Sequence, residues 1–559
     1  MTGAFGTSVS DYRGTIPGLL GLAAQRDPGG TWLRTDDLTL TFAEAAGRVG
    51  AIGAEFAEHG IGHGDLVMLT ARTTPEYLLS WLALTALGAV SVPVNPASAR
   101  AELAGLVGQV RPKAVLTDRA MYQGAGSGRG TGHGDERVHA GDGEVADAGP
   151  ARPDWLGEGD ARVRMVIDVY GLGAGRPDQP LSDLPGGEVG PGDLAVLIPT
   201  SGTTGRSKLV MQTHLAYTMA AEGFPYWMEL TAADRLMTSL PLFHINAPIY
   251  SVLGSLACGA GLVLVPRFSA SGFLDSARRH GATEFNAIGA MLEMLMRQPE
   301  RPDDADNPLR LCYAGPAPDR ERHEQIERRF GIRIVVGYAM SESPYGLIWR
   351  HGTRPYGTLG SVRQHPYLGT INEAKVVAAD PDEDVAGADG AALGPGETGE
   401  ILLRNPVITP GYWNMAAETA AVKTDDGWLH TGDLVTVNAD ETYTFVGRRK
   451  EVLRRRGENL SPLEVEEVLD SHPAVLESAV VGVASDLTEE EIKAFVVSVP
   501  GAAVDLRELR GFAAERLSAF KVPRFWQLID ELPRTPTARI AKHRLPAGHP
   551  TGEFDADAG

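Results

Sequence analysis

The chain is poor in cysteine and in positive charge. Only two of its 559 residues are cysteines, Cys258 and Cys312, so the sequence holds neither a disulfide framework nor a cysteine-rich metal site, and we expect a reducing, cytoplasmic compartment. Asp and Glu number 72 against 51 Lys and Arg, a formal net charge of −21. Nucleic-acid-binding surfaces carry a basic footprint, so this balance predicts no nucleic-acid partner and leaves room only for a local cationic pocket for phosphates.

Long uninterrupted hydrophobic runs are also missing. Two uncharged stretches, Tyr77–Val94 and Ile249–Pro266, are broken by Gly, Ser or Thr, whereas a membrane-spanning helix needs about 20 continuous apolar residues. Each stretch passes through a Gly-Ala step into an apolar run and a proline, which is typical of a helix that is stopped by glycine and followed by a short buried strand. The chain also begins without the basic and apolar segments of a secretory signal. We therefore expect no membrane span.

The composition that remains is typical of a large globular protein. Hydrophobic residues make up 43% and charged residues 22% of the chain, and the length corresponds to several domains or to one large and one smaller domain. Short apolar strand candidates alternate with helix-length segments, which predicts an α/β fold with mostly parallel sheets. The clearest strands are Leu66–Ala71, Ala114–Thr117, Leu194–Ile198, Leu262–Val265 and Ile332–Val336, and the clearest helices are Phe42–Glu58 and Ala101–Gln109.

Changes in composition divide the chain into two parts. Residues 120–163 are rich in Gly, Asp and Ala, which is typical of a loop insertion. A charged run from Arg448 to Glu451 follows a large N-terminal domain, residues 1–447. We expect a junction at 448–450 and a small α+β C-terminal domain over residues 451–559.

The C-terminal part has its own succession of predicted elements. Ser461 as a cap, Pro462 at the first helical position and the early glutamates indicate the start of a helix. The tail after Leu545 is short and has the composition of a disordered segment. The other elements expected here are strands over Ser478–Val483 and Phe495–Val499 and a helix over Leu506–Leu517.

The strongest local motif is a loop of glycines and hydroxyls that follows the strand ending at Ile198. Glycines permit close approach of the backbone, and hydroxyls with backbone N–H groups can cradle phosphate oxygens. The loop is not a Walker A sequence, because its lysine does not directly follow the second glycine. Taken alone it is also compatible with a flexible polar turn. Its candidate residues are Thr200, Ser201, Gly202, Thr203, Thr204, Gly205 and Lys208.

Other motifs follow this loop in a fixed order. They are Tyr338-Ala339-Met340-Ser341-Glu342, Trp428-Leu429-His430-Thr431-Gly432-Asp433, Gly447-Arg448-Arg449-Lys450-Glu451 and Leu532-Pro533-Arg534-Thr535-Pro536-Thr537-Ala538-Arg539-Ile540-Ala541-Lys542. Together they resemble the adenylate-forming (ANL) superfamily of acyl-CoA ligases, peptide-synthetase adenylation domains and luciferases. The ordered motifs extend over nearly the whole chain, and as a set they are highly specific.

The resemblance implies a nucleotide site for ATP and Mg²⁺. It identifies Thr200–Lys208 as the loop that holds the β- and γ-phosphates, and Glu342 as the carboxylate that binds Mg²⁺, a hard cation that suits oxygen ligands. It implies that Asp433 accepts the ribose hydroxyls and that Lys450 is the hinge about which a mobile small domain rotates. The remaining nucleotide-binding candidates are Gly315, Pro316, Ala317, Tyr338, Ser341 and Arg448, and the catalytic candidates are Thr204, His244, Glu342 and Arg539.

The segment Pro241–Asn246 is similar to the acid-pocket segment of acyl-CoA ligases. Peptide-synthetase domains carry an aspartate where this chain has His244, so the resemblance disfavours an α-amino acid. Gly457–Pro462 is similar to the carnitine-type and medium-chain branch. The resemblance thus implies a small-molecule acid and CoA as partners, with homodimers common among relatives. The pocket candidates are Phe243, His244, Asn246, Tyr250, Asn286, Gly289, Ala290, Tyr313 and Gly337.

The activity implied has two steps, in which an acyl adenylate forms with release of pyrophosphate and CoA then displaces AMP. One residue departs from the family pattern: Arg539 stands where lysine is usual, and a planar guanidinium does not replace a point contact of an amine conservatively. Three interpretations remain open. Arg539 serves with altered geometry, the enzyme works mainly on a preformed adenylate, or the chain is a degraded regulatory module that binds nucleotide. An alternative chemistry is that of secondary metabolism without CoA, such as nitrite-dependent diazotisation of an aromatic amine.

Overall fold

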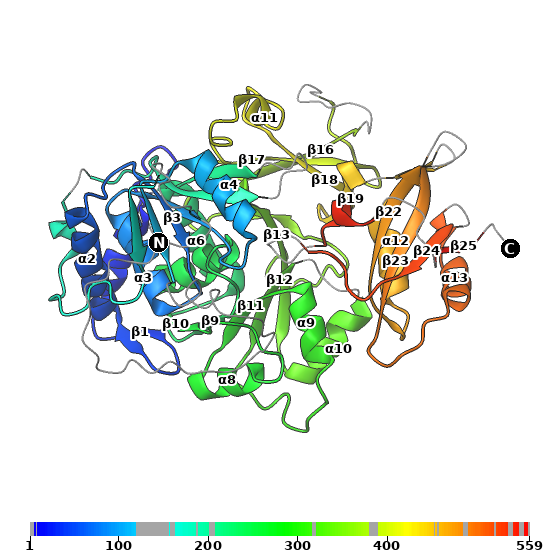
Figure 1. Ribbon diagram of the computed structural model, residues 1–559, viewed down its shortest axis with the longest axis horizontal. Coiled ribbons are helices and arrows are strands. Elements are labelled where there is room, and N and C mark those ends of the chain that lie inside the picture. Colours follow the sequence, from blue (N-terminus) through cyan, green and yellow to red (C-terminus); the bar gives the residue numbers. More distant parts are fainter. Residues whose placement is uncertain are drawn as a thin grey trace.

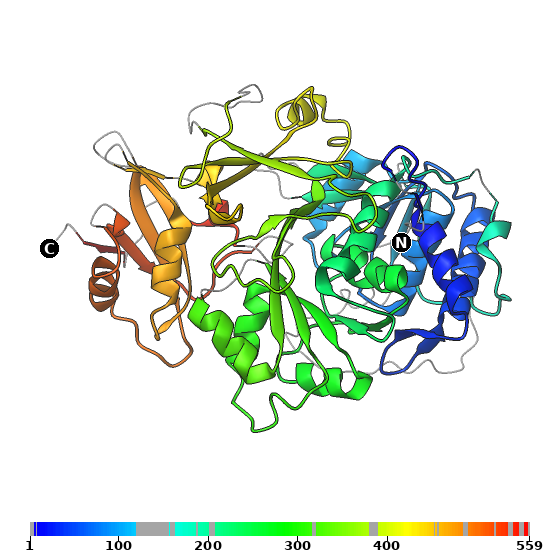
Figure 2. The ribbon, with the colours of Figure 1, turned by 180° about the vertical axis from the view of Figure 1, so that it is seen from behind.

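The fold is α/β, with a large N-terminal part built on two mostly parallel sheets and a smaller C-terminal sheet domain at one end of the molecule (Figures 1 and 2). This confirms the predicted fold class. The computed structural model describes residues 5–6, 8–118, 156, 163–185, 188–200, 207–315, 320–379, 390–451, 453–455, 458–484, 490–518, 521–534, 540–546 and 553–556. The insertion predicted over 120–163 lies outside the described residues, apart from Leu156 and Val163.

The first large sheet has six strands in the order β6-β5-β3-β4-β7-β8. All neighbours are parallel except β7 and β8, which form an antiparallel pair that places Thr200 opposite Lys208. The strands are β3 (Leu66–Thr70), β4 (Val90–Pro93), β5 (Ala114–Thr117), β6 (Met165–Asp168), β7 (Leu194–Thr200) and β8 (Lys208–Thr213). Both ends of the candidate phosphate loop are therefore anchored in one strand pair.

The second large sheet has nine strands in the order β15-β14-β13-β12-β11-β9-β10-β1-β2. The run from β13 to β1 is parallel, and antiparallel strands close both edges. Its strands are β1 (Thr31–Arg34), β2 (Thr39–Thr41), β9 (Arg235–Thr238), β10 (Gly261–Leu264), β11 (Glu284–Ile288), β12 (Leu311–Gly315), β13 (Arg333–Met340), β14 (Ser343–Ile348) and β15 (Ser361–Val362).

Helices cover these sheets and join them into one hydrophobic core, to which α1, α2, α3 and α6 contribute along with strands of both sheets. The helices are α1 (Ile16–Arg26), α2 (Phe42–Glu58), α3 (Pro75–Ala86), α4 (Arg100–Val110), α6 (His214–Met228), α7 (Gly254–Cys258), α8 (Phe273–His280), α9 (Gly289–Met296), α10 (Arg320–Phe330) and α11 (Ala416–Ala420), with short turns at Leu181–Asp183 and, in π form, at Ala247–Leu253.

The two uncharged stretches fold as their pattern predicts. Helix α3 is followed by Gly88 at φ +70° and strand β4, and α7 is followed by Gly259 at φ +75° and β10. Glycine adopts this left-handed conformation without steric cost, so it ends the helix and turns the chain into the sheet. Among the described residues no helix is both long and apolar enough to cross a bilayer.

Smaller sheets complete the molecule. An antiparallel sheet, β16-β17-β18-β19, precedes the junction, and the C-terminal sheet, β22-β23-β24-β25, has its own hydrophobic core, which begins at Leu453. The elements are β16 (Glu373–Val377), β17 (Thr398–Arg404), β18 (Leu429–Val437), β19 (Tyr443–Arg448), the turn η5 (Arg449–Glu451), β20 (Leu453–Arg455), β21 (Glu458–Leu460), α12 (Pro462–Asp470), β22 (Val475–Ala484), β23 (Glu490–Ser498), α13 (Leu506–Ala514), β24 (Phe525–Leu528), η7 (Lys542–Arg544) and β25 (Phe554–Asp555).

Two expectations for the C-terminal part are wrong. Helix α12 begins at Pro462 as predicted, but the Ser461 hydroxyl does not cap it and instead donates to the Val446 carbonyl at 2.5 Å, across the junction. The tail is not wholly without structure either, because Phe554–Asp555 pairs with β24 as an edge strand. Both contacts join segments that are distant in sequence, and a local pattern does not contain them.

Glu284 makes the stability of the fold depend on pH. Its side chain is fully buried at the start of β11, and neither carboxylate oxygen has a hydrogen-bond partner among the described residues. Burial raises the pKa of Glu284 well above its ordinary value, Asp234 raises it further, and Arg310 offsets part of the shift. A carboxyl group with a raised folded pKa contributes to stability below its unfolded pKa, and this contribution is lost as the pH rises toward the folded pKa.

We therefore expect the free energy of unfolding of Glu284→Gln to rise relative to that of the native chain as the pH increases above about 4.5. The difference should grow by up to about 1.4 kcal/mol per pH unit until the pH reaches the pKa of Glu284 in the folded state. Thermal unfolding from pH 5 to pH 8 measures the difference. The exposed Glu418→Gln serves as the control and should show a constant difference. A stability difference between Glu284→Gln and the native chain that does not change with pH would refute the assignment.

Candidate active site

The predicted residues gather where the parallel strands of the nine-stranded sheet end. Asn286 on β11 and Tyr313 on β12 are in register, and Val335 on β13 is the partner of Tyr313. Gly337 lies two residues beyond Val335 and so faces the same side of the sheet. The carboxyl ends of parallel strands are the usual location of ligand sites in α/β sheets.

Three predicted nucleotide-binding residues lie together at the end of β13. The Tyr338 hydroxyl donates to Asp433 Oδ2 at 2.6 Å, and Arg448 Nε lies 3.0 Å from Asp433 Oδ1. Burial and the Asp433 carboxylate raise the pKa of Tyr338 well above its ordinary value, so the phenol remains a donor at neutral pH. Asp433 and Arg448 are paired across strands β18 and β19, and this register fixes their distance.

A buried carboxylate positions the irregular part of strand β18 that carries Asp433. Glu400 Oε1 accepts the Gly432 backbone N–H at 2.8 Å, and Glu400 Oε2 lies 3.2 Å from His430 Nδ1 and 3.3 Å from Arg449 Nη1. Despite burial, His430 and the Gly432 N–H hold the pKa of Glu400 below its ordinary value. Gly432 has φ +73°, which a side chain at this position would disfavour.

Tyr412 brings the metal candidate and the loop lysine together. Its hydroxyl donates to Glu342 Oε1 at 2.9 Å, and Lys208 Nζ lies 4.6 Å from the centre of its ring. Gln212 on β8 donates to the Ser341 carbonyl at 2.5 Å, and the Thr409 N–H donates to the Glu342 carbonyl at 2.7 Å. The Glu342 turn is thus fastened to the strand that begins at Lys208. The half-buried Glu342 carboxylate offers the oxygen ligands that Mg²⁺ prefers.

The predicted acid-pocket residues contact one another in pairs, and Tyr250, Asn286 and Tyr313 are buried. Asn286 Nδ2 donates to Asn246 Oδ1 at 2.6 Å, and the rings of Phe243 and His244 meet edge to face with centroids 4.6 Å apart. The ring centroids of Tyr250 and Tyr313 lie 5.3 Å apart. Gly289 and Ala290 begin helix α9, directly beyond β11, and Gly315 ends β12.

Several predicted residues cannot be placed. Ser201, Gly202, Thr203, Thr204 and Gly205 lie outside the described residues, as do Pro316, Ala317 and Arg539, and for Lys450 only the backbone, in η5, is described. Their roles stay predictions. Near Arg539 in sequence, Lys542 Nζ is held 2.8 Å from Glu466 Oε1 and 3.5 Å from Glu451 Oε2.

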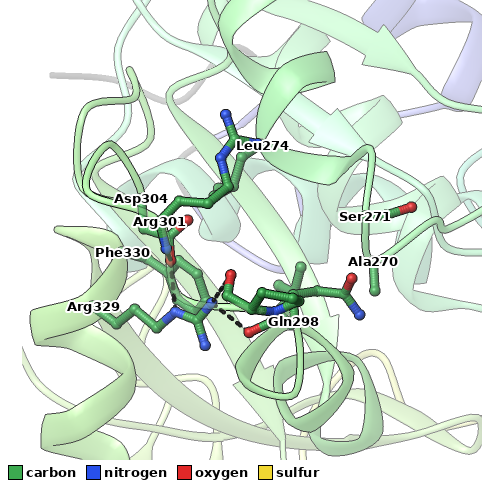
Figure 3. A pocket seen from close by; sticks show the side chains of 10 residues that line it. Ala270, Ser271, Leu274, Gln298, Arg301, Asp304, Arg329 and Phe330 are labelled. Carbon is green, nitrogen blue, oxygen red and sulfur yellow. Dashed lines mark hydrogen bonds and ion pairs between the residues drawn. The ribbon is translucent and has the colours of Figure 1, made fainter.

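A separate cavity of about 220 Å³ lies away from these residues, between α8, α9 and α10 (Figure 3). Arg329 crosses it, 2.7 Å from Asp304 Oδ2, and donates to the carbonyls of Met296 and Gln298 at 2.6 and 2.8 Å. None of the predicted site residues lines this cavity. Arg329 and Asp304 are paired with each other, and Arg301 is paired with Asp303 at 2.9 Å, so the charged side chains that line the cavity already have partners.

Comparison with protein families places these clusters in context. Residues 22–413 match the model of the AMP-binding enzyme family, and residues 464–539 match that of the AMP-binding enzyme C-terminal domain. The chain belongs to the AMP-binding enzyme family. The first match covers strand β13, which carries Tyr338, and the turn that carries Glu342, and the second covers most of the small sheet domain.

Individual relatives of this AMP-binding enzyme are CoA ligases. The crotonobetaine/carnitine–CoA ligase of Salmonella arizonae is 30% identical over 88% of this chain and 90% of its own length. The sulfoacetate–CoA ligase of Cupriavidus necator is 30% identical over 95% of this chain and 97% of its own length.

Solved structures show the same relationship. The o-succinylbenzoate–CoA synthetase of Bacillus subtilis with its acyl-adenylate intermediate superposes with a TM-score of 0.78 at 25% identity, over 95% of this chain and 98% of that one. The same synthetase with ATP and magnesium superposes with a TM-score of 0.77 at 25% identity, over 94% of this chain and 98% of that one. This AMP-binding enzyme is an AMP-forming acid–CoA ligase that uses ATP, Mg²⁺ and CoA, and the alternative of chemistry without CoA is not favoured.

Residues outside the motifs, which the sequence motifs do not identify, support the site. Tyr412 and Gln212 connect the Glu342 turn to β8, and Glu400 supports the part of β18 that carries Asp433. Their signal is weak in the sequence, since a single tyrosine, glutamine or glutamate has no distinctive spacing. Only their neighbours in space reveal what they do.

Proposed function

We propose that this AMP-binding enzyme holds the nucleotide between the Lys208–Glu342 side and the Asp433–Arg448 side of the site, and the acid at the adjoining ends of β11, β12 and β13. The observation that carries this assignment is the contact of Tyr338 with Asp433, because Tyr338 directly follows the pocket residue Gly337. An acyl adenylate that spans the nucleotide site and the acid pocket would have its ribose at Asp433 and its acyl group next to Gly337.

The roles of the side chains follow from their chemistry. Asp433 accepts hydrogen bonds from ribose hydroxyls, and Tyr338 and Arg448 hold its carboxylate in place. Lys208 supplies positive charge to phosphate oxygens, with its ammonium over the Tyr412 ring. Glu342 would hold Mg²⁺, whose charge would offset the negative charge of the phosphates. Catalysis of the first step is thus positioning and electrostatic stabilisation.

The reaction then consists of two displacements. A carboxylate oxygen of the acid attacks the α-phosphorus of ATP, and pyrophosphate leaves. The CoA thiolate next attacks the acyl carbonyl carbon, and AMP leaves with the electron pair of the broken C–O bond. In this proposal Arg539 contacts the acid and the α-phosphate in the first step, since Lys542 is already paired with Glu466 and Glu451.

We also propose residues 448–450 as a hinge between domains 1–447 and 451–559. The hydrophobic core of the C-terminal part begins just beyond, at Leu453. Arg297 Nη2 donates to the Leu476 carbonyl at 2.9 Å, and Arg544 Nη2 lies 3.2 Å from Glu102 Oε1, and both contacts join the two parts. They involve exposed side chains, so breaking them costs little and leaves rotation between the two steps possible.

Release of AMP and pyrophosphate from ATP tests the function directly. The purified protein is incubated with fatty, aryl and short polar acids, with and without CoA, and one further arm holds nitrite with an aromatic amine. We expect AMP that depends on both an acid and CoA. AMP that needs nitrite and no CoA, or nucleotide binding without AMP in every arm, would refute the proposal.

Asp433→Asn tests the nucleotide site. We expect the KM for ATP to rise roughly 10- to 100-fold, because a hydrogen bond to a charged acceptor contributes about 1.5–3 kcal/mol. The KM for the acid should change little. The exposed Asp425→Asn, on the turn before β18, is the matched control and should leave both constants unchanged. Equal effects of the two variants would remove Asp433 from the ATP site.

A further inference from the structure

Arg363 is completely buried beside the proposed acid pocket, although it carries a full positive charge. Its Nε donates to the Leu347 carbonyl at 2.9 Å, and its Nη1 donates to the Tyr250 hydroxyl at 2.9 Å and the Pro344 carbonyl at 3.3 Å. Its Nη2 donates to the Tyr313 hydroxyl. Every one of these acceptors is neutral, and one Nη2 proton has no acceptor among the described residues.

Aromatic rings supply the rest of its surroundings. The guanidinium carbon lies 4.7 Å from the ring centre of Trp227, 5.3 Å from that of Tyr250 and 5.5 Å from that of Tyr313. Stacking on aromatic faces stabilises a cation, but each such contact is weak compared with an ion pair to a carboxylate. This does not replace a counter-ion for a guanidinium that has lost its water.

The other buried cations of the described chain are paired. Arg455 Nη2 lies 2.6 Å from Glu491 Oε2, and Lys493 Nζ lies 2.5 Å from Glu553 Oε1. The described residues include three buried Lys and Arg side chains, Arg363, Arg455 and Lys493. Of these, only Arg363 forms no ion pair with a carboxylate. The fold thus otherwise obeys the rule that buried charges are compensated.

Glu222 does not provide the missing charge. It lies in the same region, but its Oε2 accepts the Tyr12 hydroxyl at 2.8 Å and is 3.4 Å from His365 Nε2. No ion pair joins it to Arg363. The buried carboxylate of this region thus accepts a hydrogen bond from Tyr12 and lies near His365, and it forms no ion pair with Arg363.

The unused edge of the guanidinium lies next to Gly337. The backbone approaches closely here, because a Cβ added to Gly337 would be 2.8 Å from Arg363 Nη2 and 2.5 Å from Tyr313 Cε2, so only glycine fits beside the two side chains without a shift. Because Gly337 precedes Tyr338, this edge is one residue away from the proposed nucleotide site. In the adjoining strand, Asn286 is in register with Tyr313, and its buried Oδ1 has no hydrogen-bond partner among the described residues.

We propose that Arg363 and the Tyr313 hydroxyl form an anion-binding end of the acid pocket, and that the acid carries a second anionic group, a carboxylate or sulfonate, on a short chain. The substrate then supplies the counter-ion that the fold omits. The chain is short because the rings of Phe224, Tyr250 and Tyr313 pack against one another behind this point, with centroid distances of 5.1–5.4 Å. A trimethylammonium acid is disfavoured by repulsion from the same guanidinium. This inference rests on the proposed placement of the acid pocket.

The test compares acids that differ only in the distal group. Succinate, succinamate, butyrate and γ-butyrobetaine, with sulfoacetate as a shorter sulfonate, are assayed for acid-dependent AMP formation with CoA. We expect kcat/KM for the anionic acids to exceed that for the neutral ones roughly 10- to 100-fold, because charge-assisted hydrogen bonds are the stronger kind. γ-Butyrobetaine should be the poorest substrate. Equal use of succinate, succinamate and butyrate would overturn the proposal.

Two variants assign the preference to these side chains. Arg363→Met should abolish the preference for succinate over succinamate and leave the KM for ATP unchanged. Tyr313→Phe is the milder variant, should reduce the preference several-fold, and remains informative if Arg363→Met does not fold. A preference that persists in the variants would show that another group recognises the anion.

Ligand-induced thermal stabilisation separates this inference from the proposed function. If no acid yields AMP, the proposed function fails, and the anion site is judged by the melting temperature alone. Stabilisation by succinate or sulfoacetate but not by succinamate, weakened in Tyr313→Phe, would support the site. Equal shifts with all three ligands, or none, would overturn it.

Discussion

Glu342→Gln is expected to slow acid-dependent AMP formation by roughly 10²- to 10³-fold, with a raised requirement for Mg²⁺. An amide retains the shape of the side chain and the hydrogen bond from Tyr412 at 2.9 Å, but it removes the negative charge that binds a hard cation. Loss of one preorganised electrostatic interaction in an active site typically costs about 3–4 kcal/mol. Initial rates over a Mg²⁺ titration, with the acid saturating, measure the effect.

Tyr412→Phe separates the effect of the Glu342 charge from the effect of its positioning by Tyr412. This variant keeps the carboxylate and removes the hydrogen bond to it, so we expect a loss of no more than about 10-fold. The exposed Glu418→Gln, on helix α11, controls for a change of net charge elsewhere and should have native rates. If the Glu342→Gln variant needs no more Mg²⁺ than the native enzyme, Glu342 is not a ligand of the Mg²⁺ ion.

Glu553→Gln is expected to destabilise the C-terminal domain by about 3–5 kcal/mol. Lys493 is fully buried on β23, and its ammonium lies 2.5 Å from Glu553 Oε1, just before the edge strand β25. Removing one partner of a buried ion pair leaves the other charge uncompensated in an apolar environment. The measurement is hydrogen exchange of the β23 and β24 amides together with thermal unfolding of the full chain.

The double variant Lys493→Met with Glu553→Gln should recover most of this loss, because both charges of the pair are removed together. Asp555→Asn is the matched control. Its pair with Arg524, at 3.1 Å, is partly exposed, and the expected loss is below about 1 kcal/mol. If the Glu553 and Asp555 variants are equally stable, the buried pair does not hold the tail to the domain.

Local patterns in the sequence were sufficient for many elements of the fold. The prediction of a helix over Phe42–Glu58 agrees with the structure residue for residue, because Thr41 and Glu44 form a capping box and apolar residues follow at helical spacing. The strand Ala114–Thr117 agrees as well, since a short apolar run fully buried in a parallel sheet has a distinct composition. These signals lie within one element and need no knowledge of its neighbours.

Other elements differ from the prediction where distant partners decide. Strand β13 continues beyond Val336 to Met340, because antiparallel pairing with β14 satisfies its backbone. The Ser461 hydroxyl donates to Val446 instead of capping its helix. The tail forms a strand at Phe554–Asp555 although its composition is typical of disorder. In each case a contact across the chain outweighs the local preference.

For the active site, the sequence by itself determined the family, the order of its motifs and the candidates Glu342, Asp433 and Arg448. Motifs of this kind are short and contiguous, so they can be recognised before the chain is folded. Only the tertiary structure decided that Tyr412 lies between Lys208 and Glu342, and that Arg363 is buried without a carboxylate. The physical reason is that the energy of a charge depends on its distance from water and from opposite charge, and folding sets both.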